Sequence, residues 1–282
     1  MFQHRGHRCQ RAPGFDTALR DVFAIHEDRA GQLWFGTSGG LATRRGEEWR
    51  VYTTRDGLSA DEVRAIVDDG AGGLWVGTRS AGLNRFANGH FTRFEPPAGP
   101  AGIDVSALCL DDTGVLWVGT FTGGLIRVEN GRANRFTTRE GLAGNAIGGI
   151  VDDGLGFLWV SSSAGLMRIA KREFSHFTPS ASGLLAVRTY GKPEGMPTRE
   201  CTLGSQPNGW RAADGRLWFP TVKGLAGVQP ALIRPNTNPP PVLIESVLID
   251  GQPQGTNRAR GDPLQAVVGP AGREHLEIHY TS

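Results

Sequence analysis

A short phrase built around tryptophan returns at a fixed interval along this chain, and the repeat limits the possible folds more than any other feature. The first four tryptophans of the series are spaced 41, 42 and 42 residues apart: Trp34, Trp75, Trp117 and Trp159. Each follows a leucine and, in the first three copies, precedes an apolar residue, Gly and Thr. A looser fifth phrase surrounds Trp218. Periods of this length are typical of proteins in which one supersecondary unit is stacked several times.

Other positions keep the same register. Six residues before each of these four tryptophans stands an aspartate, and three residues before stands a glycine: Asp28, Asp69, Asp111 and Asp153, with Gly31, Gly72, Gly114 and Gly156. A carboxylate that accepts backbone N–H bonds, followed by glycine, predicts a tight turn. Three copies end in an aromatic pair three residues apart, and the third copy keeps only Phe136. The pairs are Trp49 and Tyr52, Phe91 and Phe94, and Phe174 and Phe177.

Each copy predicts four short antiparallel strands. Asn88-Gly89 and Asn130-Gly131 predict tight hairpins between the last two strands. Glycine, at 41 of 282 residues, has about twice its usual share, as many turns require. Four strands every 42 residues or so match a propeller blade. We therefore predict an all-β fold, a β-propeller of four-stranded antiparallel blades with about five repeats present, and place the recurring tryptophans in the packing between blades.

Composition excludes several classes of protein. Hydrophobic residues make up 39% of the chain and charged residues 21%, as in a globular domain. A net charge of +2, with basic residues spread out, argues against nucleic-acid binding. The cysteines Cys9, Cys109 and Cys201 form no CxxC pair, and the seven histidines occupy unrelated repeat positions. We expect no metal site and no cofactor, and a buried, unreactive thiol at Cys109.

The repeated phrases resemble the two-component regulator propeller repeat, closely from Val22 to Leu166 and more loosely to about Pro230. The approach to the last copy, Glu194 to Cys201, is similar to that family's last blade. A Pro-rich stretch and a further β pattern then resemble the joint to a triple-tyrosine β-sandwich. The predicted domains are an irregular segment 1–14, propeller repeats 15–234, a linker 235–241 and the start of a β-sandwich 242–282.

The resemblance implies a ligand-sensing, signal-transducing module of a bacterial two-component-type receptor. It implies a periplasmic or extracytoplasmic location and a phosphorelay whose kinase or cyclase output domain belongs to the full-length protein. Family propellers usually close with more blades, so we expect a fragment of a longer sensor. The expected partners are a small-molecule or oligosaccharide ligand, the output domain and, as one option, a second copy of the chain. Nucleic acid is not expected.

The candidate binding residues lie where the copies differ most. The strand before each Asp turn is taken as the innermost strand of its blade. The link that leads into this strand and the turn that follows the Gly-Thr step then lie on the same face of the propeller. Arg55, Arg79, Phe121 and Arg139 occupy these connections. A guanidinium can pair with carboxylate or sulfate, and an exposed aromatic ring can stack on a sugar.

No catalytic residue is predicted, because a repeated turn cap explains the recurring aspartates. Two alternatives stay open: a propeller carbohydrate-active enzyme of the lyase kind, and a protein-interaction scaffold. Ionisable groups that converge on a central pocket would favour the enzyme. A broad apolar patch on the rim would favour the scaffold.

Overall fold

The computed structural model describes residues 2–5, 8–11, 21–45, 48–94, 103–177, 183–233, 243–254 and 275–281. The chain divides into two compact units, residues 1–232 and 233–282. The first unit is a β-propeller, so the predicted all-β fold of about five blades is confirmed. In the described part of the chain, the one α-helix has six residues.

The blades follow the sequence repeat, and strand order in each sheet follows chain order. Blade 1 contains β3 (Val22–Glu27), β4 (Leu33–Thr37), β5 (Gly40–Arg45) and β6 (Glu48–Tyr52); blade 2 contains β7 (Val63–Asp68), β8 (Leu74–Thr78), β9 (Gly82–Ala87) and β10 (His90–Phe94). Blade 3 contains β11 (Val105–Leu110), β12 (Leu116–Thr120), β13 (Leu125–Glu129) and β14 (Arg132–Phe136). Blade 4 contains β15 (Ile147–Asp152), β16 (Phe157–Ser162), β17 (Gly165–Ala170) and β18 (Val187–Tyr190); blade 5 contains β19 (Trp210–Arg211), β20 (Leu217–Thr221) and β21 (Gly224–Val228).

Short helices and further strands connect or flank the blades. They are the α-helix α1 (Lys171–His176) and the 3-10 helices η1 (Thr54–Asp56), η2 (Thr138–Glu140), η3 (Lys192–Glu194) and η4 (Pro230–Leu232). Near the N-terminus, β1 (Phe2–Arg5) and β2 (Arg8–Arg11) form a hairpin, so the expectation of an irregular segment 1–14 is wrong there. The second unit contains β22 (Leu243–Ile249), β23 (Gln252–Gln254) and β24 (Leu276–Thr281), in the order β23-β22-β24. The predicted linker 235–241 lies outside the described residues.

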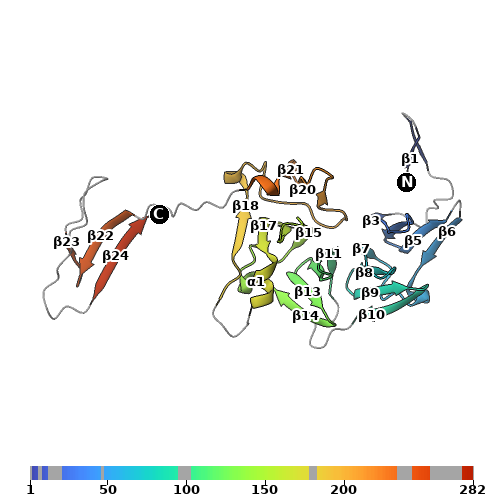
Figure 1. Ribbon diagram of the computed structural model, residues 1–282, viewed down its shortest axis with the longest axis horizontal. Helices are drawn as coiled ribbons and strands as arrows, with labels where there is room; N and C mark the ends of the chain where they lie inside the picture. The colour runs from blue at the N-terminus through green and yellow to red at the C-terminus, as the bar shows by residue number, and fades with distance from the viewer. Residues whose placement is uncertain are drawn as a thin grey trace. The chain divides into compact units, whose positions relative to one another are not determined.

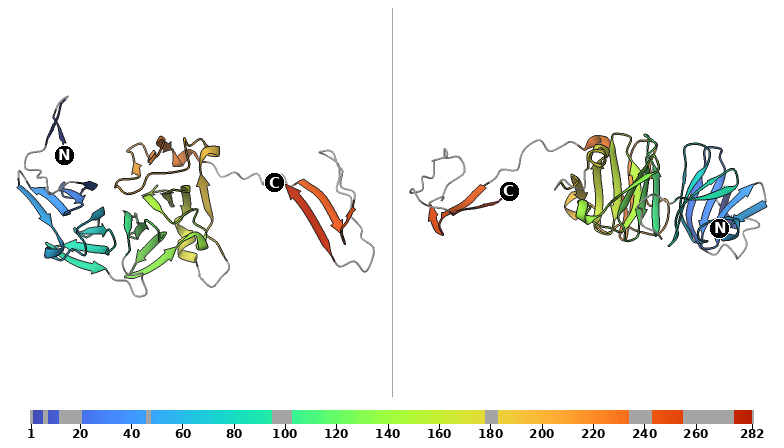
Figure 2. Two further views of the ribbon diagram at one scale, coloured as in Figure 1. Left: turned by 180° about the vertical axis from the view of Figure 1, so that it is seen from behind. Right: turned by 90° about the horizontal axis from the view of Figure 1, so that it is seen from below.

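The innermost strands of successive blades lie side by side around a common centre: β3, β7, β11 and β15 (Figures 1 and 2). The glycine of the repeated Gly-Thr step permits this approach. A Cβ atom on Gly36 would lie 2.8 Å from the backbone oxygen of Val63, and one on Gly77 would lie 2.3 Å from Val105. Because any side chain would push the neighbouring blade away, the step requires glycine.

The aspartate of each turn also holds the tryptophan. In blade 3, one carboxylate oxygen of Asp111 accepts backbone N–H bonds from Thr113 (2.9 Å) and Val115 (3.0 Å). The other accepts the indole N–H of Trp117 at 2.9 Å. The same indole bond recurs in blades 1 and 4, from Trp34 to Asp28 (2.8 Å) and from Trp159 to Asp153 (3.0 Å). The predicted turn caps are confirmed, and they also satisfy the buried indole donor.

Blade 2 departs from this arrangement. Asp69 pairs with Arg85, whose Nε lies 2.8 Å and whose Nη2 lies 2.7 Å from the carboxylate. Trp75 is only half-buried, whereas Trp34, Trp117 and Trp159 are buried. The expectation of four equivalent buried tryptophans is therefore wrong at Trp75. Arg85 binds the carboxylate of Asp69 in place of the indole of Trp75.

The fourth copy also departs from the expected outer strand. Phe174 belongs to α1, and the outer strand is β18, which ends at Tyr190. No Asn-Gly pair follows Ala170, so the chain makes a helical turn where blades 2 and 3 reverse in a tight hairpin. Phe174 and Phe177 still pack on Phe136, with ring centroids 4.9 Å and 5.4 Å apart.

The segment before β19 ties the fifth blade to the first two. The backbone N–H of Gln206 donates to Phe23 at 2.7 Å, and that of Ile25 donates to Gln206 at 3.2 Å. The Gln206 side chain bonds both backbone groups of Ile66, at 2.6 Å and 3.2 Å. One glutamine therefore joins segments about 140 and 180 residues away.

Replacing Trp117 should destabilise the protein more than replacing Trp75. Trp117→Ala removes a buried ring and leaves Asp111 without its indole partner, so the free energy of unfolding should fall by about 3–5 kcal/mol. Trp75→Ala should cost less, because that ring is already partly exposed. Urea denaturation of both variants measures this, and equal losses would contradict the account of blade 2.

Stability should also fall in acid. Burial acts to raise the pKa of Asp28 and Asp69, but the hydrogen bonds that both carboxylates accept outweigh it, so each pKa lies below its ordinary 3.8. A carboxyl with a depressed folded pKa stabilises the protein above its unfolded pKa and loses that contribution as pH falls through the folded value. We expect the melting temperature to drop below about pH 4. It should drop less in the Asp28→Asn, Asp69→Asn double variant, and a profile unchanged by that replacement would contradict the assignment.

Candidate functional site

One end of the innermost strands gathers polar and aromatic side chains from several blades. Arg64 is the second residue of β7, and its guanidinium carbon lies 3.7 Å from the ring centroid of Phe23 on β3. The same carbon lies 5.9 Å from the ring centroid of Phe121, which follows β12. Arg64 Nη1 donates to the carbonyl of Gly204 at 3.0 Å. Blades 1, 2 and 3 and the approach to blade 5 therefore meet at one arginine, and we call Phe23, Glu62, Arg64, Arg79, Phe121 and Gly204 the Arg64 cluster.

Glu62 joins a second arginine to this cluster. Its Oε1 accepts a hydrogen bond from Arg64 Nε at 2.7 Å and also pairs with Arg64 Nη2. The same oxygen lies 3.3 Å from Arg79 Nη1. The Arg79 side chain is 54% exposed, so most of its five N–H donors face solvent. The cluster thus combines a mostly buried guanidinium, hydrogen-bonded at each of its three nitrogens, with one that is 54% exposed.

Two of the four predicted site residues lie in this cluster, and two do not. Arg79 and Phe121 are brought together through Glu62 and Arg64. Arg55 and Arg139 are exposed on η1 and η2, the links between blades. Within the described residues, no hydrogen bond or ion pair joins either of them to the cluster.

Both links are held by the same local device. At η2, the Glu140 carboxylate accepts hydrogen bonds from the backbone N–H and the hydroxyl of Thr137, both at 2.7 Å. Burial acts to raise the pKa of Glu140, but these bonds hold it below its ordinary value. Asp56 and Thr53 repeat the capping box at η1. These carboxylates stabilise the conformation of the two links. Arg55 and Arg139, next to them in the chain, are exposed.

Sequence reasoning missed Arg64 and Glu62. Arg64 is the second residue of an innermost strand, where the other copies carry Phe23, Ser106 and Gly148, and Glu62 directly precedes that strand. A charged residue at an inward position of a repeat is the signal that would have found Arg64.

The repeat can now be compared with known proteins. The family model described as two component regulator propeller matches residues 19–39, 57–80 and 99–122, which include the turn and tryptophan phrases of blades 1, 2 and 3. These three segments match the two-component regulator propeller repeat. Comparison with the curated proteins finds no match.

Solved structures share the fold. The extracellular domain of the hybrid two-component system BT3049 from B. thetaiotaomicron aligns with a TM-score of 0.71 and 20% identity, over 96% of this chain and 36% of that one. The extracellular domain of BT4673 from the same organism aligns with a TM-score of 0.53 and 20% identity, over 83% of this chain and 30% of that one. This chain thus spans about a third of the length of these two domains.

An enzyme shares the architecture as well. A virginiamycin B lyase from Staphylococcus aureus aligns with a TM-score of 0.54 and 16% identity, over 80% of this chain and 74% of that one. At these identities the likeness shows the fold alone, so a regulator propeller and a lyase propeller have to be told apart by their side chains.

The opposite end of the propeller carries an acidic cluster. Single oxygens of Asp111, Asp112 and Asp152 lie within 4.8 Å of one another. Lys171 occupies the cluster: its Nζ lies 3.0 Å from Asp152 and 3.9 Å from Asp111, and it also bonds Asp112. Burial acts to lower the pKa of Lys171, but hydrogen bonds to Asp112 and Asp152 raise it to about 12. The cation of this cluster is therefore an ammonium group supplied by the chain.

The nearby thiol of Cys109 is partly buried rather than fully buried as predicted. Burial raises the pKa of Cys109 to about 12, so the thiol stays protonated at neutral pH. Burial also raises the pKa of Cys201, to about 11. Neither thiol is a nucleophile under these conditions, because thiolate is the reactive form.

Without the ammonium group of Lys171, the negative charges of Asp111, Asp112 and Asp152 should repel one another. Lys171→Met should lower the free energy of unfolding by about 1.5–3 kcal/mol, since charge-assisted hydrogen bonds are lost. Millimolar Ca²⁺ should restore part of the melting temperature in the variant and leave the parent protein unchanged. Thermal melts with and without Ca²⁺ measure this, and a variant as stable as the parent would contradict the role given to Lys171.

Proposed function

We propose that this chain is a ligand-sensing, signal-transducing propeller module of a bacterial two-component-type receptor, non-catalytic in itself. The observation that supports it best is the Arg64 cluster, where an exposed guanidinium and an aromatic ring stand together at one end of the propeller axis. A small molecule or oligosaccharide with an anionic group fits this chemistry. Arg79 would pair with the anion, and Phe121 would stack on the apolar face.

The rigidity of the cluster supports a sensing role. Arg64 is held by an ion pair, a backbone carbonyl and two rings, so its neighbours are positioned before a ligand arrives. Because these contacts come from separate blades, a ligand that pulls on Arg79 and Phe121 acts on several blades at once. Gly204 belongs to the segment that leads into blade 5, which offers a physical route for the signal.

The location and output follow from the same proposal. The BT3049 and BT4673 structures are extracellular domains, and by analogy this chain would act outside the cytoplasm. None of the helices in the described ranges has the length and hydropathy of a membrane span. The full-length receptor would then carry the output domain of the phosphorelay.

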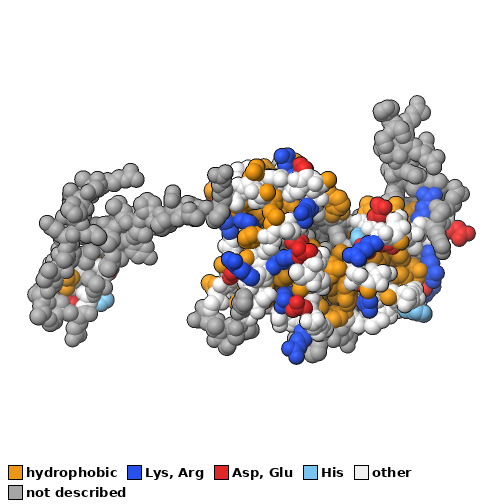
Figure 3. Space-filling view, viewed as in Figure 1, with side chains coloured by type: hydrophobic (Ala, Val, Ile, Leu, Met, Phe, Trp, Pro, Cys, Tyr) orange, Lys and Arg blue, Asp and Glu red, His pale blue; other side chains and the backbone are white. Residues whose placement is uncertain are grey.

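The lyase-like alternative needs a free acid or base near the cluster. Glu62, the carboxylate of the Arg64 cluster, is engaged by both Arg64 and Arg79. On the face seen in Figure 3, basic and acidic side chains are interspersed, with no broad single-sign field. Both features favour binding over catalysis.

A panel of neutral, uronic and sulfated oligosaccharides tests the proposal by titration calorimetry. We expect a uronic or sulfated member to bind. Arg79→Ala and Phe121→Ala should each weaken binding about tenfold or more, the effect of losing one charge-assisted bond or ring contact. Arg55→Ala and Arg139→Ala should weaken it less, because those side chains stand on the blade links.

The matched control is Arg132→Ala, an exposed arginine on the outer strand β14, which should bind like the parent protein. If the Arg79 and Phe121 variants also bound like the parent, the Arg64 cluster would not be the site. Bond cleavage in a bound oligosaccharide would favour the enzyme.

A further inference from the structure

Two turns carry Arg79 and Phe121 of the Arg64 cluster. Arg79 opens the turn between β8 and β9, and Phe121 directly follows β12. Between the Thr and the next Gly-Leu step, both turns have one residue more than the turn of blade 1: residues 79–81 and 121–123 against 38–39. The shorter turn of the repeat does not define the shape of these longer ones, so other contacts have to fix where Arg79 and Phe121 lie.

One residue, Asp104, binds to both turns. It directly precedes β11, the innermost strand of blade 3. Its Oδ1 accepts hydrogen bonds from the backbone N–H of Ser80 at 2.5 Å and from the Ser80 hydroxyl at 3.2 Å. Its backbone carbonyl accepts the N–H of Phe121 at 3.1 Å. Asp104 therefore connects the turn that carries Arg79, in blade 2, with Phe121 in blade 3.

The turn of blade 2 needs such support. Ser80 has a φ of 63°, in the left-handed region that few residues other than glycine adopt. The backbone N–H of Arg79 donates to the carbonyl of Glu62 at 2.9 Å, within the same blade. The N–H of Gly82 donates to the carbonyl of Ile103 at 3.0 Å, in the approach to the next blade. Both blades thus hold the turn, and the carboxylate of residue 104 holds its centre.

The carboxylate contact is an addition to the repeat. At the position of Asp104, the other blades with a full repeat phrase carry Asp21, Glu62 and Ala146. Ala146 has no side-chain acceptor, and the carboxylate of Glu62 binds Arg64 and Arg79 instead. The repeat thus does not require this contact, which lies between the two blades that carry Arg79 and Phe121.

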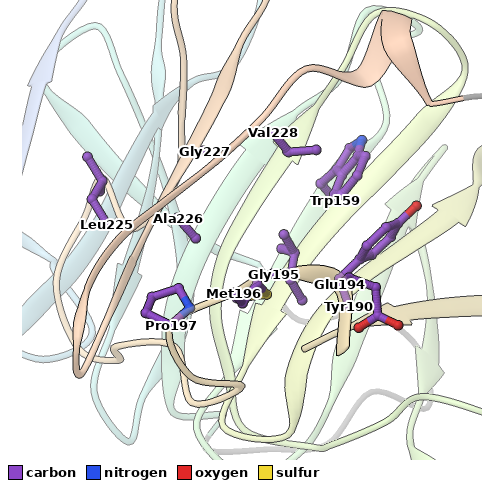
Figure 4. Close-up of a pocket in the computed structure, with 11 residues that line it drawn as sticks. Trp159, Tyr190, Glu194, Gly195, Met196, Pro197, Leu225, Ala226, Gly227 and Val228 are labelled. Atoms are coloured by element: carbon purple, nitrogen blue, oxygen red, sulfur yellow. The ribbon is translucent and has the colours of Figure 1, made fainter. Parts of the chain in front are cut away.

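The pocket between blades 4 and 5 lacks the chemistry of the Arg64 cluster. It has a volume of about 170 Å³ and is lined by Trp159 and Tyr190 of blade 4 and by Val228 of blade 5, among others (Figure 4). Its charged side chain is Glu194, whose carboxylate accepts the backbone N–H of Gly191 at 2.7 Å. None of the described residues that line it is basic. An anionic ligand would therefore gain no charge pairing there, whereas the Arg64 cluster offers such pairing beside an aromatic ring.

We propose that Asp104 is a positioning residue that sets the spacing between Arg79 and Phe121, and that this spacing selects the ligand. The inference rests on the proposed function, because it takes the Arg64 cluster as the ligand site. An oligosaccharide is selected when its carboxylate or sulfate meets Arg79 while one of its rings stacks on Phe121. An isomer with the anion on another ring makes one of these contacts at the expense of the other.

Three trisaccharides that differ only in which ring is a glucuronate are the probes, in titration calorimetry with the full chain. The parent protein should prefer one isomer. Asp104→Ala should reduce that preference by about fivefold, the effect of losing one hydrogen bond. Asp104→Asn keeps a side-chain oxygen for the Ser80 N–H and should retain the preference. The matched control is Asp214→Ala, which removes a turn bond of the same kind in blade 5, from the Arg216 N–H at 3.0 Å, and should change nothing.

Hydrogen exchange separates the two levels of the proposal. In Asp104→Ala the amide of Ser80 should exchange faster than in the parent, with or without ligand, while the amides of β17 keep their rates. Equal exchange at Ser80 in both proteins would overturn the role of Asp104 alone. A preference that survives faster exchange, or a parent that binds all three isomers equally, would show that this spacing selects nothing. If the parent bound none of the probes, the proposed function would fail and the selection with it.

Discussion

The close approach of innermost strands in successive blades is the contact on which the rest of this structure depends. Gly36 and Gly77 leave no room for a Cβ atom against Val63 and Val105, so each blade seats directly on the next. In blades 1, 3 and 4 the repeated tryptophan fills the space farther out, and the turn aspartate accepts its indole N–H bond. One phrase of the repeat thus supplies the glycine at the contact between blades, the tryptophan that packs beyond it and the aspartate that binds the indole. This explains why the phrase stays so constant along the chain.

The two ends of the propeller differ in how constant their side chains are from blade to blade. At one end, the repeated aspartates hold turns and tryptophans, and Lys171 neutralises the carboxylates that crowd there. At the other end, the links and turns differ from blade to blade, and the ring geometry brings their side chains to the axis. Phe23, Arg64 and Phe121 come from three different blades and meet only because the blades stack in order. A varied surface on a constant frame is consistent with the ligand-sensing role proposed above.

The sequence predicted what local chemistry determines. The blade repeat, the Asp turns and the Asn-Gly hairpins depend on residues a few positions apart, and each is found, with Asn88 and Asn130 at positive φ. What escaped prediction depends on contacts between distant residues. Arg85 takes the carboxylate that would otherwise hold Trp75, and Gln206 bonds Ile66 across the centre. For the candidate site, Arg79 and Phe121 were predicted because they lie in connections where the copies differ most. Arg64 was missed because it lies inside a strand that otherwise looks structural.

The unfolding free energy of Gly36→Ala tests the central contact most directly. The added Cβ would lie 2.8 Å from the backbone oxygen of Val63, which cannot move without shifting blade 2. The account predicts a loss of about 1–3 kcal/mol, the usual cost of overpacking a core. Gly183→Ala, which adds the same methyl group in open space, should change stability by less than about 0.5 kcal/mol. If Gly36→Ala were as mild as Gly183→Ala, close blade contact would not be what holds this propeller together.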